Sequence, residues 1–124
     1  MRLRPILVKR VDETPAPEDG LRVLVDRLWP RGLTAQKVSA DLWLRDLAPS
    51  PRLRNWYGHD PQRWEEFRQR YRAELERAAG ALRTLHELRR RSRVTLLHAA
   101  RSPEHNHALV LRDFLSGNSQ GGMQ

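Results

Sequence analysis

The sequence predicts an α/β fold: a small, mostly parallel sheet of three or four strands flanked by helices, in a single compact domain. Two short apolar runs, Val23–Val25 and Val94–Leu97, lack regular alternation with polar residues, which is typical of strands covered on both faces. Helical patterns separate these runs, and strands that alternate with helices favour a parallel sheet. We expect the domain to span residues 1–116, followed by a flexible tail over residues 117–124.

Three strands are expected in chain order. The first runs from Leu3 to Val11, and Pro5 places its start at a sheet edge or outside the hydrogen-bond ladder. The second runs from Leu21 to Arg27 and the third from Arg93 to Ala99. Because a helical connection joins the second strand to the third, the right-handed crossover rule makes them parallel neighbours or near neighbours. The loop between the first and second strands is short for a parallel crossover, so their mutual direction stays open.

Capping residues followed by proline mark the starts of three helices. Ser50, Asp60 and Ser102 each precede a proline, and this pairing of N-cap and N1 residues favours a helix start. Gly80 interrupts the apolar pattern, after which a further helix is expected to about Arg90. Each helix repeats apolar residues at spacings of three and four, which gives it one face for the core.

Two shorter patterns complete the assignment of elements. Helical turns are expected from Thr34 to Val38 and again around the apolar residues Leu42, Trp43 and Leu47. The aromatic stripe of the longer helix, which consists of Trp64, Phe67 and Tyr71, is interpreted as core rather than as a surface that stacks nucleic-acid bases.

Arginine dominates the charge of the chain. Lys and Arg number 23 against 15 Asp and Glu, a net charge of +8, and the only lysines are Lys9 and Lys37. Arginine binds phosphate and carboxylate groups through a two-pronged guanidinium, so this composition favours an anionic partner. The alternative explanation is the codon usage of a GC-rich genome.

The absence of cysteine excludes several classes of chemistry. Disulfides, thiolate catalysis and cysteine-ligated zinc or iron–sulfur sites all require that residue.

The N-terminal residues lack the apolar core of a signal peptide, and no stretch approaches the roughly 20 apolar residues of a membrane span. We therefore expect a cytoplasmic protein that has no membrane partner, and the oligomeric state stays open.

Polar and aromatic side chains follow the second and third strands directly. Parallel strands end at the same sheet edge, and ligands of open α/β sheets bind outside that edge. The free N–H groups after Ser102 add partial positive charge there. We therefore predict an anion site with these ligand-binding residues: Arg27, Trp29, Arg31, Arg101, Ser102 and Asn106. One alternative is that Asp26 and Arg27 form a structural ion pair and that Pro-Arg-Gly is only a turn; another is that Asp26 and Glu104 neutralise these arginines and nothing binds.

Catalysis at this edge is left open. Asp26 and His107 are the candidate catalytic residues, since either can act as a general base. No nucleophile–base pair is visible from the spacing of residues. We expect no cofactor. We also expect no metal, because the rings of His105 and His107 point about 200° apart on a helix and could share a metal ion only if the chain bends there.

Two functions fit these observations. The leading prediction is a site for a small anionic molecule, namely a phosphate, a carboxylate or a nucleotide. The alternative is a nucleic-acid-binding or transcription-regulatory module, which the net charge of +8 favours. Phosphate contacts to nucleic acid are strongly salt-dependent, so binding at different salt concentrations separates the two functions.

Several strings in the chain resemble one known family. They include residues 25–32 (Val-Asp-Arg-Leu-Trp-Pro-Arg-Gly), 58–61 (Gly-His-Asp-Pro), 94–100 (Val-Thr-Leu-Leu-His-Ala-Ala) and 104–108 (Glu-His-Asn-His-Ala). From about Ile6 to Leu115 the chain resembles the YeaO-like branch of the family called domain of unknown function 488. This resemblance implies a small α/β domain in a bacterial or archaeal cytoplasmic protein, and it assigns no activity.

The resemblance also bears on two candidate residues. Many relatives have tyrosine where this chain has His98, which speaks against a catalytic role for that histidine. Longer members of the wider family have Cys-His-Arg where this chain has Asn106, His107 and Ala108. Any chemistry of that cysteine is therefore not carried over to this chain.

Overall fold

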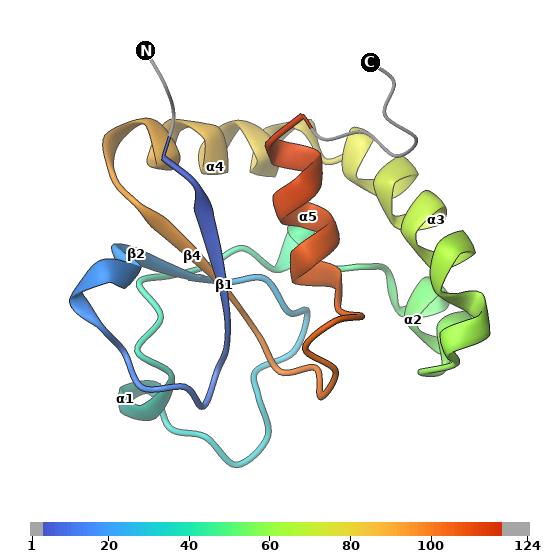
Figure 1. Cartoon of the computed structure of the whole chain (residues 1–124), viewed down its shortest axis with the longest axis horizontal. Helices are drawn as coiled ribbons and strands as arrows, with labels where there is room; N and C mark the ends of the chain where they lie inside the picture. The colour runs from blue at the N-terminus through green and yellow to red at the C-terminus, as the bar shows by residue number, and fades with distance from the viewer. Residues whose placement is uncertain (1–3, 118–124) are drawn as a thin grey trace.

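Four parallel strands form one sheet in the order β1-β4-β2-β3 in the computed structural model, which describes residues 4–117. The strands are β1 (Ile6–Arg10), β2 (Leu21–Leu24), β3 (Leu42–Trp43) and β4 (Val94–His98). The predicted α/β fold with a small parallel sheet is confirmed (Figure 1). Residues 118–124, most of the expected flexible tail, lie outside the described residues, and Gly117 closes a turn after the last helix.

The central strand β4 pairs with β1 on one side and with β2 on the other. Ile6 and Leu21 both stand opposite Val94, which sets the register of the two pairings. All five residues of β4 are buried, as the unalternating sequence of this strand predicts. The second and third predicted strands are therefore parallel neighbours, and the first strand, whose direction the sequence left open, is parallel as well.

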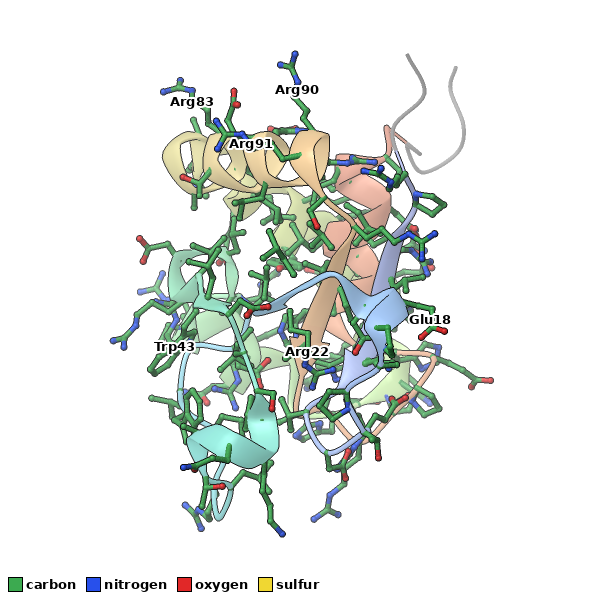
Figure 2. All side chains as sticks on the ribbon, turned by 90° about the vertical axis from the view of Figure 1, so that its left-hand side faces the viewer. Glu18, Arg22, Trp43, Arg83, Arg90 and Arg91 are labelled. Carbon is green, nitrogen blue, oxygen red and sulfur yellow. The ribbon has the colours of Figure 1, made fainter. Side chains whose placement is uncertain are left out.

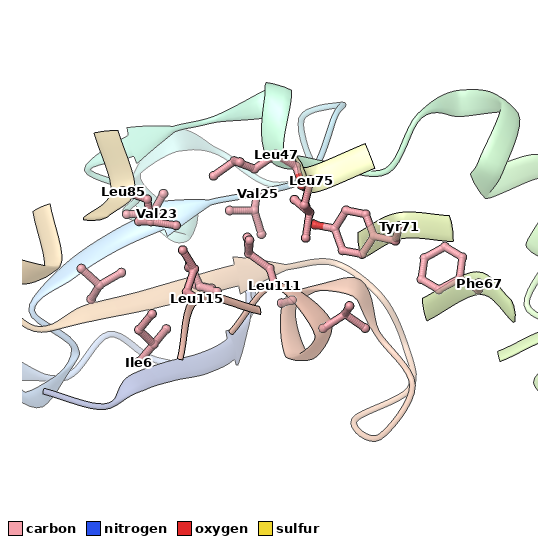
Figure 3. Packing of buried hydrophobic residues seen from close by; sticks show 14 of the residues in the cluster. Ile6, Val23, Val25, Leu47, Phe67, Tyr71, Leu75, Leu85, Leu111 and Leu115 are labelled. Carbon is pink, nitrogen blue, oxygen red and sulfur yellow. The ribbon is translucent and has the colours of Figure 1, made fainter. Parts of the chain in front are cut away.

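Most of the core lies on one face of the sheet. Alternate residues of a strand point to opposite faces, so Val23 and Leu96 share a face that several helices cover. Figure 3 shows residues of this cluster, with Leu111 of the last helix near Val25, which directly follows β2, and Leu85 beside Val23 of that strand. The opposite face holds a smaller cluster around Leu24, which the short helix α1 (Ala35–Val38) covers.

The covering helices are α2 (Pro51–Tyr57), α3 (Trp64–Glu76), α4 (Ala79–Arg91) and α5 (His107–Leu115). Short 3-10 turns precede α2 at Arg45–Leu47 and α3 at Pro61–Arg63, and a third, Pro17–Asp19, lies between β1 and β2. The N-cap role predicted for Ser50 is confirmed, because its side chain accepts a hydrogen bond from the N–H of Leu53. Asp60 likewise caps the 3-10 turn that leads into α3.

The prediction of a helical turn at Leu42 and Trp43 is wrong, because these residues form the edge strand β3. Asp41 is the physical reason. Its N–H donates to the carbonyl of Arg22, and its carboxylate accepts from the Arg22 N–H at 2.8 Å. These two bonds dock the segment alongside β2, and this long-range pairing outweighs the local helical pattern.

Two helix boundaries also differ from the prediction. The last helix begins at His107 and is capped by Asn106, not by Ser102. The hydroxyl of Ser102 instead accepts from the N–H groups of Glu104 and His105, which forms a tight turn before the helix. The break between α3 and α4 falls before Gly80, which lies within the first turn of α4.

A buried group of charges links the start of β2 to its neighbours. Arg22 donates to the Asp19 carboxylate at 2.6 Å and to the carbonyls of Val38 and Ser39, while the Lys9 ammonium lies 2.8 Å from Asp19. Burial raises the pKa of Asp19, but hydrogen bonds from Lys9, Ala16 and Arg22 outweigh this effect and lower it. The paired charges hold α1 against the sheet.

Candidate functional site

A cavity of about 980 Å³ opens at the carboxyl ends of β2 and β4. Its walls come from the loop after β2, from the end of α2 with the start of α3, and from the loop between β4 and α5. Figure 1 shows these loops at the lower end of the sheet, away from α4. All but one of the residues that the sequence predicted for the site line this cavity: Asp26, Trp29, Arg31, Arg101, Ser102, Asn106 and His107.

Asp26 and His107 form a pair at the cavity wall. Oδ1 of Asp26 lies 3.0 Å from Nε2 of His107, and Oδ2 accepts a hydrogen bond from the Ala99 N–H at 3.0 Å. Nε2 also lies 3.1 Å from the carbonyl oxygen of Val25. Because both neighbours of Nε2 are acceptors, this nitrogen carries the proton, and Nδ1 is the lone-pair nitrogen of the neutral ring.

His98 lies behind this pair and is buried. Its Nδ1 accepts a hydrogen bond from the N–H of Ala100 at 3.0 Å. Burial, followed by the neighbouring His107, lowers the pKa of His98 to about 4. This histidine is therefore neutral near pH 7 and acts as a structural acceptor. It does not line the cavity.

Arg27 is the predicted ligand residue that the structure does not bring to the cavity. Its guanidinium donates to the carbonyls of Ala48 and Pro49 at 3.2 and 3.4 Å. It lines a separate cavity of about 290 Å³ together with Glu74. The alternative prediction of an Asp26–Arg27 ion pair is also wrong, because Asp26 is paired with His107.

Ser102 and Asn106 shape the loop between β4 and α5. The amides of Glu104 and His105, which the prediction offered to a ligand, donate to the Ser102 hydroxyl. The Asn106 side chain accepts from the Leu109 N–H and donates to the Ser102 carbonyl, both at 3.0 Å. These bonds fix the shape of the loop at the cavity wall, and they engage both the oxygen and the nitrogen of the Asn106 side-chain amide.

Three arginines from three different segments line the cavity. Arg31, Arg54 and Arg101 are exposed, and none of them has an acidic partner within residues 4–117. Arg54 could not be predicted from the sequence, because its place depends on how α2 packs against the rest of the fold, and no local pattern gives that packing. The cavity therefore has a positive lining that can attract an anion.

Aromatic rings line the same cavity. Trp29 donates its indole N–H to the Leu33 carbonyl at 2.8 Å. Trp64, which the sequence analysis assigned to the core, is half-buried and lines the cavity, stacked on Phe67 with ring centroids 5.4 Å apart. His105 lies against Trp64 at 4.9 Å. The assignment to the core holds for the buried Phe67 and Tyr71, although Phe67 also lines the cavity, and the half-buried Trp64 is shared between core and cavity.

Residues 4–117 contain neither a group of metal ligands nor a membrane-spanning helix. No cluster of three or more His, Asp or Glu side chains in that range could hold a metal ion. None of the helices there is long and apolar enough to cross a membrane. The lining instead provides arginine and histidine donors beside aromatic rings.

Comparisons with known proteins add a family context to this geometry. A family model described as "Inactive DUF488-N3 subclade", DUF488-N3i, matches residues 5–121. The chain is 46% identical over 112 residues to uncharacterized protein Rv3073c of Mycobacterium tuberculosis (strain ATCC 25618 / H37Rv). The matched segment covers 90% of this chain and 94% of that relative. It is 37% identical over 110 residues to uncharacterized protein YeaO of Escherichia coli (strain K12), and this match covers 89% of this chain and 96% of that relative. No solved structure matches the chain.

Proposed function

We propose a ligand-binding role for this chain, which belongs to the YeaO-like DUF488 family, in the subclade described as inactive. The ligand is a small anionic molecule, and its site is the cavity at the carboxyl ends of β2 and β4. Two observations favour binding over turnover. The subclade is described as inactive, and Asn106 stands where the resemblance gives longer relatives a cysteine.

The unpaired arginines of the cavity carry this proposal. Arg31, Arg54 and Arg101 gather three positive charges around one space without a carboxylate partner among the described residues. Like charges repel, and a bound anion relieves that repulsion while accepting charge-assisted hydrogen bonds. The amino-terminal end of α5, which also reaches the cavity, adds partial positive charge.

The Asp26–His107 pair gives the site a fixed imidazole. Because Nε2 of His107 lies 3.1 Å from the Val25 carbonyl oxygen and 3.0 Å from Oδ1 of Asp26, it carries the ring hydrogen, and Nδ1 is left to accept from a ligand hydroxyl. Asp26 acts through His107 as a positioning residue, since its carboxylate is already bonded to the Ala99 N–H.

A thermal-shift screen with inorganic phosphate and citrate tests the proposal. A ligand at 100 times its dissociation constant stabilises the folded state by about 2.7 kcal/mol. Arg31→Ala and Arg101→Ala are expected to reduce this shift strongly. Arg52→Ala, which removes an exposed arginine of α2 outside the cavity lining, serves as the matched control and keeps the wild-type response. Equal shifts in all four proteins, or no shift in any, contradict the proposal.

A second candidate function is binding to nucleic acid through α4. Figure 2 shows Arg83, Arg90 and Arg91 on this helix with side chains directed outward. All three are exposed, and they share the surface with the single acidic residue Glu87 of α4. Such a row of arginines suits contacts to a phosphate backbone.

Salt dependence tests this second candidate. Binding of mixed-sequence DNA or RNA that persists at physiological salt, and that the triple variant Arg83→Ala/Arg90→Ala/Arg91→Ala abolishes, supports it. Binding that salt removes entirely contradicts it. We also propose a cytoplasmic location, on the resemblance to cytoplasmic proteins of the family, and cell fractionation tests that location.

A further inference from the structure

We propose that the ligand of the cavity at the strand ends is a mononucleotide, with its phosphate among the arginines and its base against the aromatic lining. This inference rests on the proposed anion-binding function and names the ligand class for the same site. Four observations support it: the size of the cavity, its aromatic side chains, the way these rings are held, and the polar groups beside them.

The cavity is larger than an inorganic anion requires. Its volume of about 980 Å³ lies near the upper end of the 300–1,000 Å³ typical of clefts that hold small organic ligands. An isolated phosphate or carboxylate held by two arginines leaves most of this space to water. A ligand that fills it therefore has a sizeable part besides its anionic group.

Aromatic and apolar side chains line the space that the anion leaves. Trp29, Tyr57 and Trp64 all line the cavity, and they come from the loop after β2, from α2 and from α3. Leu28 lines it beside Trp29; at 69% and 36% exposed, these neighbours are two of the four exposed large apolar side chains among the described residues, and adjacent exposed apolar residues mark binding surfaces. Such exposure is explained if a flat, partly apolar group covers these residues in the bound state.

The rings are held in place before any ligand binds. The indole N–H of Trp29 is bonded to the Leu33 carbonyl, and its ring packs edge-on against Trp43 at 5.5 Å. Trp43 in turn donates to the Asp26 carbonyl at 2.7 Å. Trp64 is stacked on Phe67. Because these rings lose little freedom on binding, stacking a base costs little conformational entropy.

Polar groups beside the rings can read the edge of a base. Asn55 and His59 line the cavity and are exposed, and no hydrogen bond engages either side chain within the described residues. An amide offers both a donor and an acceptor, which matches the alternating donors and acceptors of a nucleobase edge. A simple sugar phosphate has no group that uses the aromatic lining and these edges together.

A ligand series measured by isothermal titration calorimetry tests the inference. The probes are inorganic phosphate, ribose 5-phosphate, adenosine, and the monophosphates of adenosine and uridine. Stacking of one base on an aromatic side chain is worth about 1–3 kcal/mol, so at least one nucleotide should bind about 5- to 150-fold more tightly than ribose 5-phosphate. Adenosine, which lacks the phosphate, should bind more weakly than its monophosphate.

Tryptophan variants locate the base. Trp29→Leu and Trp64→Leu should each reduce the preference for the nucleotide over ribose 5-phosphate and leave the affinity for ribose 5-phosphate within about twofold. Trp56→Leu is the matched control, because this tryptophan of α2 lies outside the cavity lining, with Arg70 stacked over its ring at 4.3 Å. It should keep the full preference. Thermal melting shows which variants are folded, and either cavity variant alone is sufficient for the test.

The outcomes separate this inference from the proposed function. Binding of phosphate and ribose 5-phosphate with no gain from a base, or an unchanged preference in both cavity variants, overturns the nucleotide assignment and leaves the anion site standing. Failure of every anion to bind overturns both. An oligonucleotide that binds far more tightly than any mononucleotide, with a steep salt dependence, also overturns the nucleotide assignment and favours a nucleic-acid surface.

Discussion

Asp26 Oδ1 lies 3.0 Å from His107 Nε2, so a carboxylate from the loop after β2 holds the first residue of α5. The other oxygen of Asp26 accepts from the Ala99 N–H, directly after β4. One carboxylate therefore bonds the residue after β4 through Oδ2, and through Oδ1, which makes no hydrogen bond among the described residues, it lies against the start of α5 at the wall of the cavity. The geometry of the proposed site depends on this link.

Replacement of Asp26 by asparagine should disturb the His107 ring. The asparagine oxygen can still accept from Ala99, but its NH₂ group then faces the protonated Nε2 of His107, and two donors oppose each other. We expect a loss of about 1–3 kcal/mol of unfolding free energy and weaker phosphate binding. Imidazole ¹⁵N chemical shifts report the tautomer directly. A wild-type spectrum without the Nε2–H tautomer, or one unchanged in Asp26→Asn, contradicts this description.

His98 should make stability depend on pH on the acidic side. Its pKa is about 4 in the folded protein and about 6.5 when unfolded, so the unfolded chain binds more protons between these values. Stability therefore falls as pH drops from about 6.5 towards 4. His98→Asn keeps an acceptor for the Ala100 N–H and does not titrate.

The asparagine variant should lack roughly 3 kcal/mol of this pH dependence, taking about 1.36 kcal/mol for each pKa unit. Urea denaturation at several pH values between about 4 and 7 measures the slope for both proteins. Equal slopes for wild type and His98→Asn would falsify the assignment of His98 as a buried neutral group.

The buried pair of Asp19 and Arg22 should be costly to break. Asp19→Asn leaves the Arg22 guanidinium and the Lys9 ammonium without their carboxylate, and removal of one partner of a buried pair costs about 3–5 kcal/mol. The exposed pair between Glu66 and Arg70 is the control, because Glu66→Gln should cost less than about 1 kcal/mol. Similar losses in the two variants would show that the Asp19 pair is no stronger than a surface contact.

Gly20 should not tolerate a side chain. Its φ is +63°, and a Cβ atom there would lie 2.3 Å from the carbonyl oxygen of Arg93. Gly20→Ala must shift the backbone where β2 meets β4, so we expect destabilisation of about 3 kcal/mol or more. Gly80→Ala in α4 meets no atom within 4 Å and should stabilise by about 1 kcal/mol. Thermal melting measures the stability of both variants against wild type. A Gly20→Ala protein with the melting temperature of wild type would contradict this prediction.

The strands could be predicted where burial and local pattern agree. Val23–Val25 and Val94–Leu97 are apolar because β2 and β4 are covered on both faces, so their composition reflects their place in the sheet. The edge strand at Leu42 and Trp43 could not be predicted in this way. It is held by the Asp41 bonds to β2, a contact between distant residues that no local pattern reports.

The site was partly predictable for a related reason. The rule that ligands bind at the ends of parallel strands brings Asp26, Arg31 and Arg101 to one edge, because it depends only on strand direction. Arg27 differs because the path of the chain after the strand directs its side chain to the carbonyls of Ala48 and Pro49. Contributions from α2 and α3 depend on helix packing, which spacing in the sequence does not give.

An NMR titration of the ¹⁵N-labelled protein with inorganic phosphate locates the bound anion. We expect saturable shifts of backbone amides in residues 29–32 and 99–107, around Arg31 and Arg101, with the amides of α4 unchanged. Arg101→Ala should remove these shifts. Shifts confined to the exposed arginines of α4, or no saturable shift at any phosphate concentration, would contradict an anion site at the ends of β2 and β4.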